Sequence, residues 1–256
     1  MMMLLTLLRK DLMEQWRTKK ILILIIIFLF VAISSPIIAK LTPELLKSIS
    51  VPGLTINLPS PTYSDSIDQF IKNTSQIALL VLVFVVAGAV SDEKNRKTLE
   101  ILLTKPVSRM MFILSKFKSY FLSISVIFAA CSAIFYQYTV TTFASFNALN
   151  FAVMVGNILI YILMIASITI LASTFVKNSI AAGGIGFVSY ILFGTLFDFF
   201  EPLKKFSPNT IFSTYKDVVT HGWNGDLLLP LLVMVSIIVL SMLVAIVIFR
   251  RQEIER

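Results

Sequence analysis

The sequence has few charged residues, one cysteine and one histidine among its 256 residues. Charged residues make up 14% of the chain and hydrophobic residues make up 57%. Soluble domains carry about 25% charged residues and about 45 to 50% apolar residues. The excess of apolar side chains is more than one soluble core can bury, so most of it must face lipid. The composition therefore predicts a polytopic membrane protein.

The scarcity of reactive side chains excludes several kinds of chemistry. Cys131 has no second cysteine with which to form an intramolecular disulfide, and it offers no cysteine-based metal site. His221 is expected in a loop, where a solvated role is the usual one. The chain contains neither a GxxxxGK[ST] phosphate loop nor an HExxH motif. We therefore expect no catalytic, cofactor-binding or metal-binding residue, and no ATP site in this chain.

Six stretches reach or approach the roughly 20 apolar residues that a membrane-spanning helix requires. They predict an all-α polytopic fold with six transmembrane helices in one membrane domain, residues 21–249. The second stretch is short and must include its polar shoulder from about Asn73 to span the bilayer. The stretches are 21–39, 77–90, 120–138, 151–176, 180–200 and 227–249.

The net charge of +8 is distributed as a topology signal, because the lysines and arginines alternate with the apolar stretches. No basic domain is present, so nucleic acid is not an expected partner. Positive residues gather at the N-terminus, in the loop 91–118 and in the tail 250–256, which predicts that both termini are cytoplasmic. The loops 40–72 and 201–226 are then outside the cell membrane. The first apolar run exceeds the core of about 7 to 15 residues found in signal peptides, which favours a retained span.

Residues 1–20 predict a separate amphipathic helix. This pattern is typical of a helix lying in the membrane interface, with Trp16 at the level of the lipid headgroups and lysines facing lipid phosphate. A helical extension of the first span is the alternative. The residues on the apolar sector are Leu5, Leu8, Leu12 and Trp16, and those outside it include Lys10, Asp11, Glu14 and Arg17.

The outside loops and the later spans each carry a pattern of their own. Prolines interrupt the loop 40–72, in which Thr42 and Pro43 resemble a helix start, and residues 64–73 predict a short helix entering the membrane. Small residues in the fourth and fifth spans predict tight or sliding helix contacts. Since strong charges are scarce in the spans, a conducted substrate would be apolar, amphipathic or lipid-like. The small residues include Ser167, Thr169, Ala172, Ser173, Ala181, Ala182, Gly183, Gly184 and Gly186.

The loop 91–118 has the most informative pattern. Residues 92–105 lack glycine and proline, and three leucines share one helical face beside charged neighbours. Pro106 ends this element, so the sequence predicts a short amphipathic coupling helix parallel to the membrane, and then a second helix from about Arg109. An ordinary solvated loop is the alternative, although an apolar face in such a hairpin suits a partner's groove. The leucines are Leu99, Leu102 and Leu103.

The same segment resembles the signature of the type-two, export-type permeases of ATP-binding-cassette (ABC) transporters. That pattern runs Glu, a few residues, Gly-Thr, then Glu, Leu, Pro-Val-Ser-Arg and a later Lys. Lys97 stands in place of the usual glycine, a departure that concerns the local turn geometry. The matching residues are Glu93, Thr98, Glu100, Leu103, Pro106, Val107, Ser108, Arg109 and Lys116.

The resemblance implies a permease subunit that pairs with a second permease subunit, identical or paralogous. A separate ATPase subunit would bind the ATP and dock on the coupling helix. An ATP-independent carrier and a non-transporting scaffold or sensor are the alternatives, and the scarcity of charged groups in the spans disfavours the carrier. We expect Lys94 to lie away from the leucine face and to matter little. The residues expected to couple to the ATPase are Asp92, Glu93, Arg96, Thr98, Leu99, Glu100, Leu102, Leu103, Pro106 and Arg109.

Overall fold

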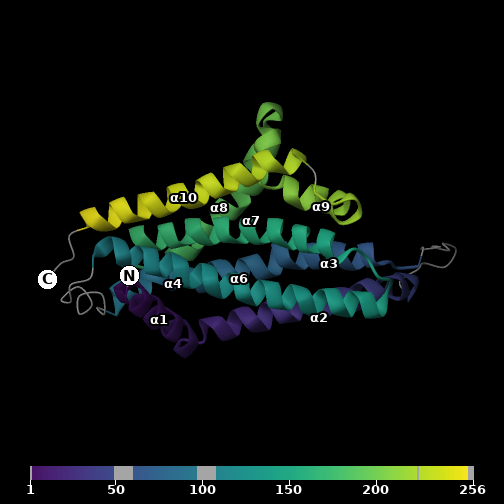
Figure 1. Cartoon of the computed structure of the whole chain (residues 1–256), viewed down its shortest axis with the longest axis horizontal. Helices are drawn as coiled ribbons and strands as arrows, with labels where there is room; N and C mark the ends of the chain where they lie inside the picture. Colours follow the sequence, from purple (N-terminus) through teal and green to yellow (C-terminus); the bar gives the residue numbers. More distant parts are fainter. Residues whose placement is uncertain (1, 49–59, 97–107, 224, 253–256) are drawn as a thin grey trace.

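The computed structural model describes residues 2–48, 60–96, 108–223 and 225–252. Within these ranges the chain is helical without a strand, and the long helices form one elongated bundle (Figure 1). The helices are α1 (Met2–Arg17), α2 (Lys20–Ser48), α3 (Tyr63–Asn73), the π-helix η1 (Thr74–Ala78), α4 (Leu79–Asn95), α6 (Arg109–Thr142), α7 (Ala148–Phe175), α8 (Ser179–Phe199), the 3-10 helix η2 (Glu201–Phe206), α9 (Thr210–His221), the 3-10 helix η3 (Gly225–Leu227) and α10 (Leu228–Arg251).

The predicted all-α polytopic architecture is confirmed. Five helical stretches are long and apolar enough to cross a membrane, and they coincide with five of the six predicted spans. The remaining predicted span, 180–200, falls in α8, whose apolar stretch Ser179–Phe193 is shorter than the others. The five stretches are Lys20–Leu45, Tyr63–Asn95, Arg109–Thr142, Ala148–Phe175 and Gly225–Arg251.

The short second span is completed by the helix that precedes it. Helices α3, η1 and α4 follow one another without a break over Tyr63–Asn95, so the predicted entry helix and the predicted span form one helical stretch. The stretch begins where the backbone N–H and the hydroxyl of Thr62 both donate to Asp65 Oδ2, at 2.7 and 3.0 Å. This capping interaction satisfies a backbone donor that a helix N-terminus leaves free.

The predicted helix start at Thr42 and Pro43 is wrong, because α2 continues through both residues to Ser48. The hydroxyl of Thr42 donates to the carbonyl of Ile38 at 2.7 Å, as a residue inside a helix does. Pro36 also lies inside α2. A proline removes one backbone hydrogen bond, and long apolar helices tolerate this loss where the surrounding backbone bonds are kept.

Helix α1 is a separate element that meets α2 at an angle (Figure 1). The two helices are divided at Thr18 and Lys19, and Lys19 has a φ of 63°, outside the helical range. The hydroxyl of Thr18 donates to the carbonyl of Glu14 at 2.7 Å, which satisfies an acceptor at the end of α1. The alternative of one continuous helix with the first span is therefore wrong. The place of α1 in the membrane interface stays a prediction.

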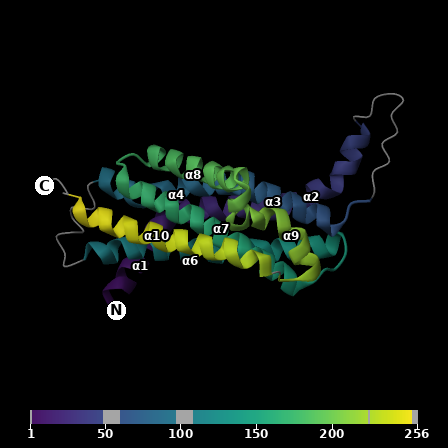
Figure 2. The ribbon, with the colours of Figure 1, turned by 90° about the horizontal axis from the view of Figure 1, so that it is seen from above.

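Helix α7 forms the centre of the bundle, in contact with α4, α6, α8, α9 and α10 (Figure 2). Helix α2 packs on α3 and α6, and α8 packs on α4 and α7. Stacked aromatic rings join α3 to α6, since the ring centroids of Phe70 and Phe135 lie 4.2 Å apart. Fully buried apolar side chains from α2, α4, α6 and α7 extend this core along the bundle.

Two glycines allow α8 to approach its neighbours closely. A Cβ at Gly186 would lie 2.5 Å from Thr169 Oγ1, and a Cβ at Gly183 would lie 2.7 Å from the ring of Phe84. Gly184 has no atom within 4 Å of such a Cβ, so it does not take part in this contact. The close approach of α8 to α4 and α7 is the tight helix contact that the small residues predicted.

Candidate coupling site

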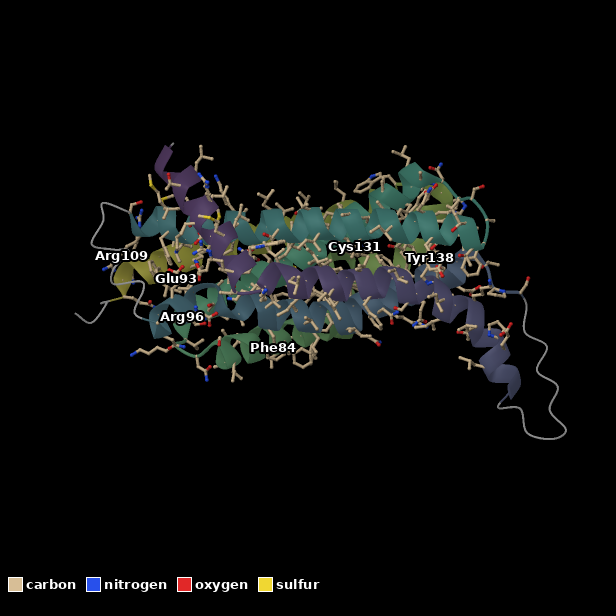
Figure 3. All side chains as sticks on the ribbon, turned by 90° about the horizontal axis from the view of Figure 1, so that it is seen from below. Phe84, Glu93, Arg96, Arg109, Cys131 and Tyr138 are labelled. Carbon is tan, nitrogen blue, oxygen red and sulfur yellow. The ribbon has the colours of Figure 1, made fainter. Side chains whose placement is uncertain are left out.

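The helices that flank residues 97–107 finish at one end of the bundle, together with α1 and the C-terminal part of α10 (Figure 3). We call this the α1 end, and the opposite end, which carries α9, the α9 end. Helix α4 ends at Asn95, and α6 begins after Ser108, whose Oγ accepts from the backbone N–H of Met111 at 3.2 Å. The expected coupling segment is therefore flanked on both sides by regular helix. We call the end of α4 and the start of α6 its two stems.

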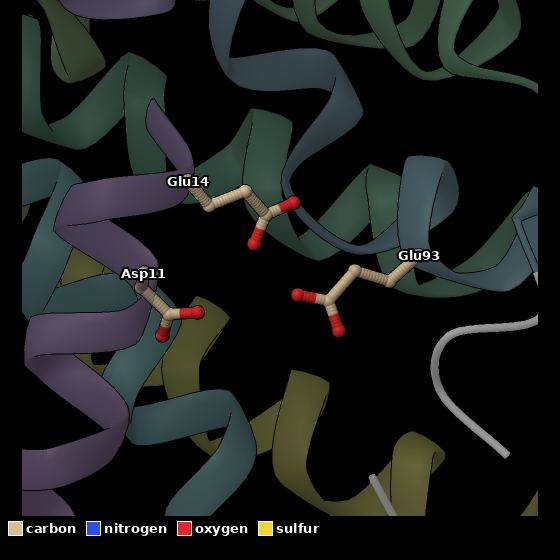
Figure 4. Close-up of side chains that lie close together, drawn as sticks. All are labelled: Asp11, Glu14 and Glu93. Carbon is tan, nitrogen blue, oxygen red and sulfur yellow. The ribbon is translucent and has the colours of Figure 1, made fainter. Parts of the chain in front are cut away.

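Glu93 points from α4 into the bundle, toward two carboxylates of α1 (Figure 4). Lys116 of α6 lies among these three groups. Its Nζ is 2.5 Å from Glu93 Oε1, 3.0 Å from Asp11 Oδ1 and 3.2 Å from Glu14 Oε2. Lys10 Nζ adds a second contact to Glu93 Oε1, at 2.6 Å. We call these five residues the charge network.

The charge network is buried at its centre, where Asp11, Glu93 and Lys116 are each at most 3% exposed. Burying an unpaired charge costs several kcal/mol, whereas a paired and hydrogen-bonded charge is tolerated. Three carboxylates also lie close enough together to hold a metal ion. The ammonium of Lys116 already lies among their oxygen atoms, so this arrangement fits a lysine rather than a metal ion. The network joins α1, α4 and α6 as one unit.

The polar face of α1 docks on α6 through a second set of contacts. The Gln15 amide donates to Ser119 Oγ at 3.0 Å and accepts from Ser123 Oγ at 2.8 Å. Ser115 Oγ donates to Asp11 Oδ2 at 2.5 Å. Residues four apart share a helix face, so one row on α1 meets one row on α6.

This docking was not predicted, although the sequence contained a signal for it. The expectation that lysines of α1 face lipid phosphate is wrong for Lys10, which points inward to Glu93. The predicted apolar face of α1 does lie on the outside of the bundle, because Leu5 and Trp16 are exposed. The signal is the matched four-residue spacing of polar residues, which are Asp11 and Gln15 on one helix and Ser115, Ser119 and Ser123 on the other.

The last turn of α4 makes two further contacts with other helices. Lys20 Nζ, at the start of α2, donates to Asp92 Oδ2 at 2.8 Å and to the hydroxyl of Tyr120 at 3.3 Å. Lys94 Nζ donates to the carbonyl of Thr174 at 2.5 Å. A cation at that place stabilises the C-terminus of α7, whose last carbonyls lack helical partners. Lys94 is therefore partly buried and bonded inside the chain, while the expectation that its replacement matters little for ATPase docking stays a prediction.

Arg109 anchors the other stem, at the start of α6. Its Nη1 donates to three carbonyls at the C-terminus of α10, those of Phe249, Arg250 and Gln252, at 3.3, 2.9 and 2.7 Å. The ring of Phe112 stacks on that of Phe249 with centroids 5.1 Å apart. A guanidinium suits this position because it offers several donors to carbonyls that carry partial negative charge.

The expected coupling residues divide into three groups. Asp92, Glu93 and Arg109 make contacts inside the chain, whereas Arg96 is exposed at the end of α4. The predicted helix does not begin at Asp92, since Asp92 to Asn95 are the last turn of α4. The apolar face of that helix lies outside the described residues, so its fold stays a prediction. The expected site residues in that interval are Thr98, Leu99, Glu100, Leu102, Leu103 and Pro106.

Comparison of the sequence with known proteins identifies its family. The family model described as ABC-2 family transporter protein matches residues 5–254. The chain is also 24% identical over 230 residues to the uncharacterized transmembrane protein YxlG of Bacillus subtilis (strain 168), with 88% of each chain covered. The family match runs from α1 through both stems of the coupling segment to the end of α10. The chain therefore belongs to the ABC-2 family of transporter membrane proteins.

Proposed function

We propose that this chain is the non-catalytic, export-type permease subunit of an ABC transporter, driven by ATP hydrolysis in a separate ATPase subunit. The family match supports the permease role. The ATPase would dock on residues 97–107, which follow the exposed Arg96. The observation that carries this proposal is the anchoring of both stems of that segment, by Glu93 on one side and by Arg109 on the other.

Anchored stems suit the transfer of force from a docked ATPase into the membrane domain. A movement of the docked segment would act directly on α4 and α6, the two helices that flank it. The charge network would pass this movement to α1, and Arg109 would pass it to α10. Separating the buried charges would cost several kcal/mol, so the helices at the α1 end would move together instead of sliding apart.

In this proposal the α1 end faces the cytoplasm of the cell and the α9 end faces outside. Two copies, or this chain and a paralogue, would form the translocation path with two ATPases. The exposed apolar faces of α2 and α8 are the expected contacts between permeases, and they include Ile26, Phe30, Val188 and Ile191. A substrate moving between such faces would be apolar, amphipathic or lipid-like.

The test is a pull-down of the ATPase with the double variant Leu102→Asp and Leu103→Asp. A carboxylate placed in an apolar docking groove lacks a partner, which costs several kcal/mol, so we expect the complex to be lost. Leu149→Asp is the matched control, because Leu149 is 73% exposed at the opposite end of the bundle. That control should keep the ATPase. Membrane levels of each variant show whether insertion is intact.

The outcome also separates this proposal from its alternatives. Retention of the ATPase and of transport by the double aspartate variant would contradict coupling through residues 97–107. Absence of any co-purifying ATPase from the unmodified protein would favour the carrier or the scaffold. A single permease bound to a single ATPase that still transports would contradict the paired assembly.

A further inference from the structure

Helix α1 has two chemically different sides. One side carries Asp11 and Gln15, which are buried against α6. The opposite side is exposed and apolar, with Leu5 57% and Trp16 62% exposed. The first side is explained by the charge network, whereas the second has no partner within the described part of the chain.

A groove of about 750 Å³ follows this exposed side and reaches the first turn of α2. It is open along its length, so it is a surface groove rather than an enclosed pocket. The walls are apolar except for Arg9 and Arg17. The apolar lining residues are Leu5, Leu8, Leu12, Met13, Trp16 and Ile21.

The charges at this groove are of one sign. The carboxylates of α1 turn inward to Lys116, and no ion pair of the described residues involves Arg9 or Arg17. Both arginines are exposed. They are eight residues apart, which corresponds to about 12 Å along a helix. The groove therefore offers two guanidinium groups beside an apolar surface.

We propose that this groove binds an anionic phospholipid, with an acyl chain along the apolar wall and the phosphate-bearing headgroup at the arginines. Its position supports a lipid, since the groove adjoins the start of the membrane stretch Lys20–Leu45. A tryptophan beside arginines is the side-chain combination that favours the headgroup region. Guanidinium groups bind phosphate through charge-assisted hydrogen bonds. The arginines thus take the role that the sequence had assigned to lysines.

A bound lipid would act on more than α1. The opposite side of α1 contacts Lys116 through Asp11 and Glu14 and contacts Glu93 through Lys10, so occupancy of the groove would bias the position of the α4 stem. Anionic lipid content of the bilayer would then influence the coupling segment. This inference concerns lipid binding and does not depend on the presence of an ATPase.

Trp16 offers a direct readout of groove occupancy. The chain has two tryptophans, so Trp223→Phe leaves Trp16 as the single indole. The variant protein is reconstituted in phosphatidylcholine vesicles, and Trp16 fluorescence is measured as brominated phosphatidylglycerol or brominated phosphatidylcholine replaces part of the lipid. We expect phosphatidylglycerol to bind about 30-fold more strongly, as attraction of roughly 1 kcal/mol for each of the two arginines implies.

Arg9→Gln with Arg17→Gln should remove this preference while quenching by both lipids remains. Arg251→Gln is the matched control, because Arg251 is an exposed arginine at the same end of the bundle and should leave the preference unchanged. Equal quenching by the two lipids in the Trp223→Phe protein would overturn the proposal, as would a preference that survives the double variant. Protection of Trp16 from both lipids would show that protein, such as a second copy, covers the groove, and would also overturn it.

Discussion

The two ends of the bundle are held together by different kinds of contact. At the α1 end, charges that are almost fully buried join three helices. At the α9 end, Lys216 contacts Asp68 of α3 at 2.9 Å, but its side chain is 55% exposed. Exposed ion pairs contribute about 0 to 1 kcal/mol, whereas breaking a buried pair costs about 3 to 5 kcal/mol. We propose that the α1 end moves as a rigid unit and that the α9 end is where helices separate.

Other contacts at the α9 end combine hydrogen bonds with apolar packing. The hydroxyl of Tyr215 donates to Asp68 Oδ1, and Asn150 Nδ2 of α7 donates to the carbonyl of Val219 at 3.1 Å. Gly222, which ends α9, has a φ of 88° and approaches Asn150 closely. Helix α9 is thus docked on α3 and α7 by a few hydrogen bonds around a small pocket of about 40 Å³, together with buried apolar side chains such as Ile211 and Val218 and the packed rings of Phe212 and Tyr161.

The largest effect is expected for Lys116→Met, which leaves the buried carboxylates of Asp11 and Glu93 without their central cation. We expect a loss of about 3 to 5 kcal/mol in stability and a lowered Tm in detergent. Lys118→Met is the matched control on the same helix, because Lys118 is exposed and should change the stability by less than about 0.5 kcal/mol. Similar Tm values for the two variants would show that the α1 end is not held by its charges.

A smaller loss is expected where α8 meets α7. Gly186→Ala places a methyl group against Thr169, and such overpacking typically costs about 1 to 3 kcal/mol. Gly184→Ala adds the same methyl group in open space, so it should be neutral or should stabilise the helix by up to about 1 kcal/mol. Thermal unfolding of both variants measures the difference. Equal stability would contradict the close approach of α8.

The smallest loss is expected at the α9 end, for Tyr215→Phe. Loss of one hydrogen bond to a charged group typically costs about 1.5 to 3 kcal/mol, and the partial exposure of Asp68 places this loss near the lower value. Faster hydrogen exchange in α9 would report it. Tyr63→Phe is the control, since Tyr63 lines the same pocket and packs on Phe146 through its ring. If Tyr215→Phe lowered the stability as much as Lys116→Met does, the two ends of the bundle would not differ in the strength of their polar contacts.

The same contact has a defined pH dependence. Burial and the neighbouring Asp68 carboxylate raise the pKa of the Tyr215 hydroxyl above its usual value. A group with a raised pKa in the folded state contributes stability that is fully present below its unfolded pKa, which is about 10 for tyrosine. That contribution is lost as the pH rises through the folded pKa. Hydrogen exchange in α9, corrected for the intrinsic pH effect, should therefore show constant protection from Tyr215 up to about pH 10, and a decline near neutral pH would contradict this.

Much of the fold follows from hydrophobic length, because a helix that crosses lipid must be apolar for most of its span. The membrane helices and the amphipathic character of α1 were therefore predicted. The inward orientation of Lys10 and the contact of Lys94 with Thr174 were not, because they depend on helices that are far apart in the sequence. Arg109 was identified by resemblance alone, while its contacts with α10 required the packed structure.

One cross-link at each end tests whether the α1 end moves as a rigid unit while helices separate at the α9 end. Both links are made in a Cys131→Ala background and in the complex reconstituted with its ATPase. Ser91→Cys with Ser173→Cys links α4 to α7 near the α1 end, where the two hydroxyl oxygens lie 3.3 Å apart. Ser64→Cys with Thr220→Cys, joined by a short bifunctional reagent, links α3 to α9 across the small pocket. ATP hydrolysis and transport are measured before and after reduction of each link. We predict that the link near the α1 end leaves both activities intact and that the link at the α9 end stops transport until it is reduced. Loss of transport from the first link, with normal transport in the presence of the second, would contradict a rigid α1 end and a separating α9 end.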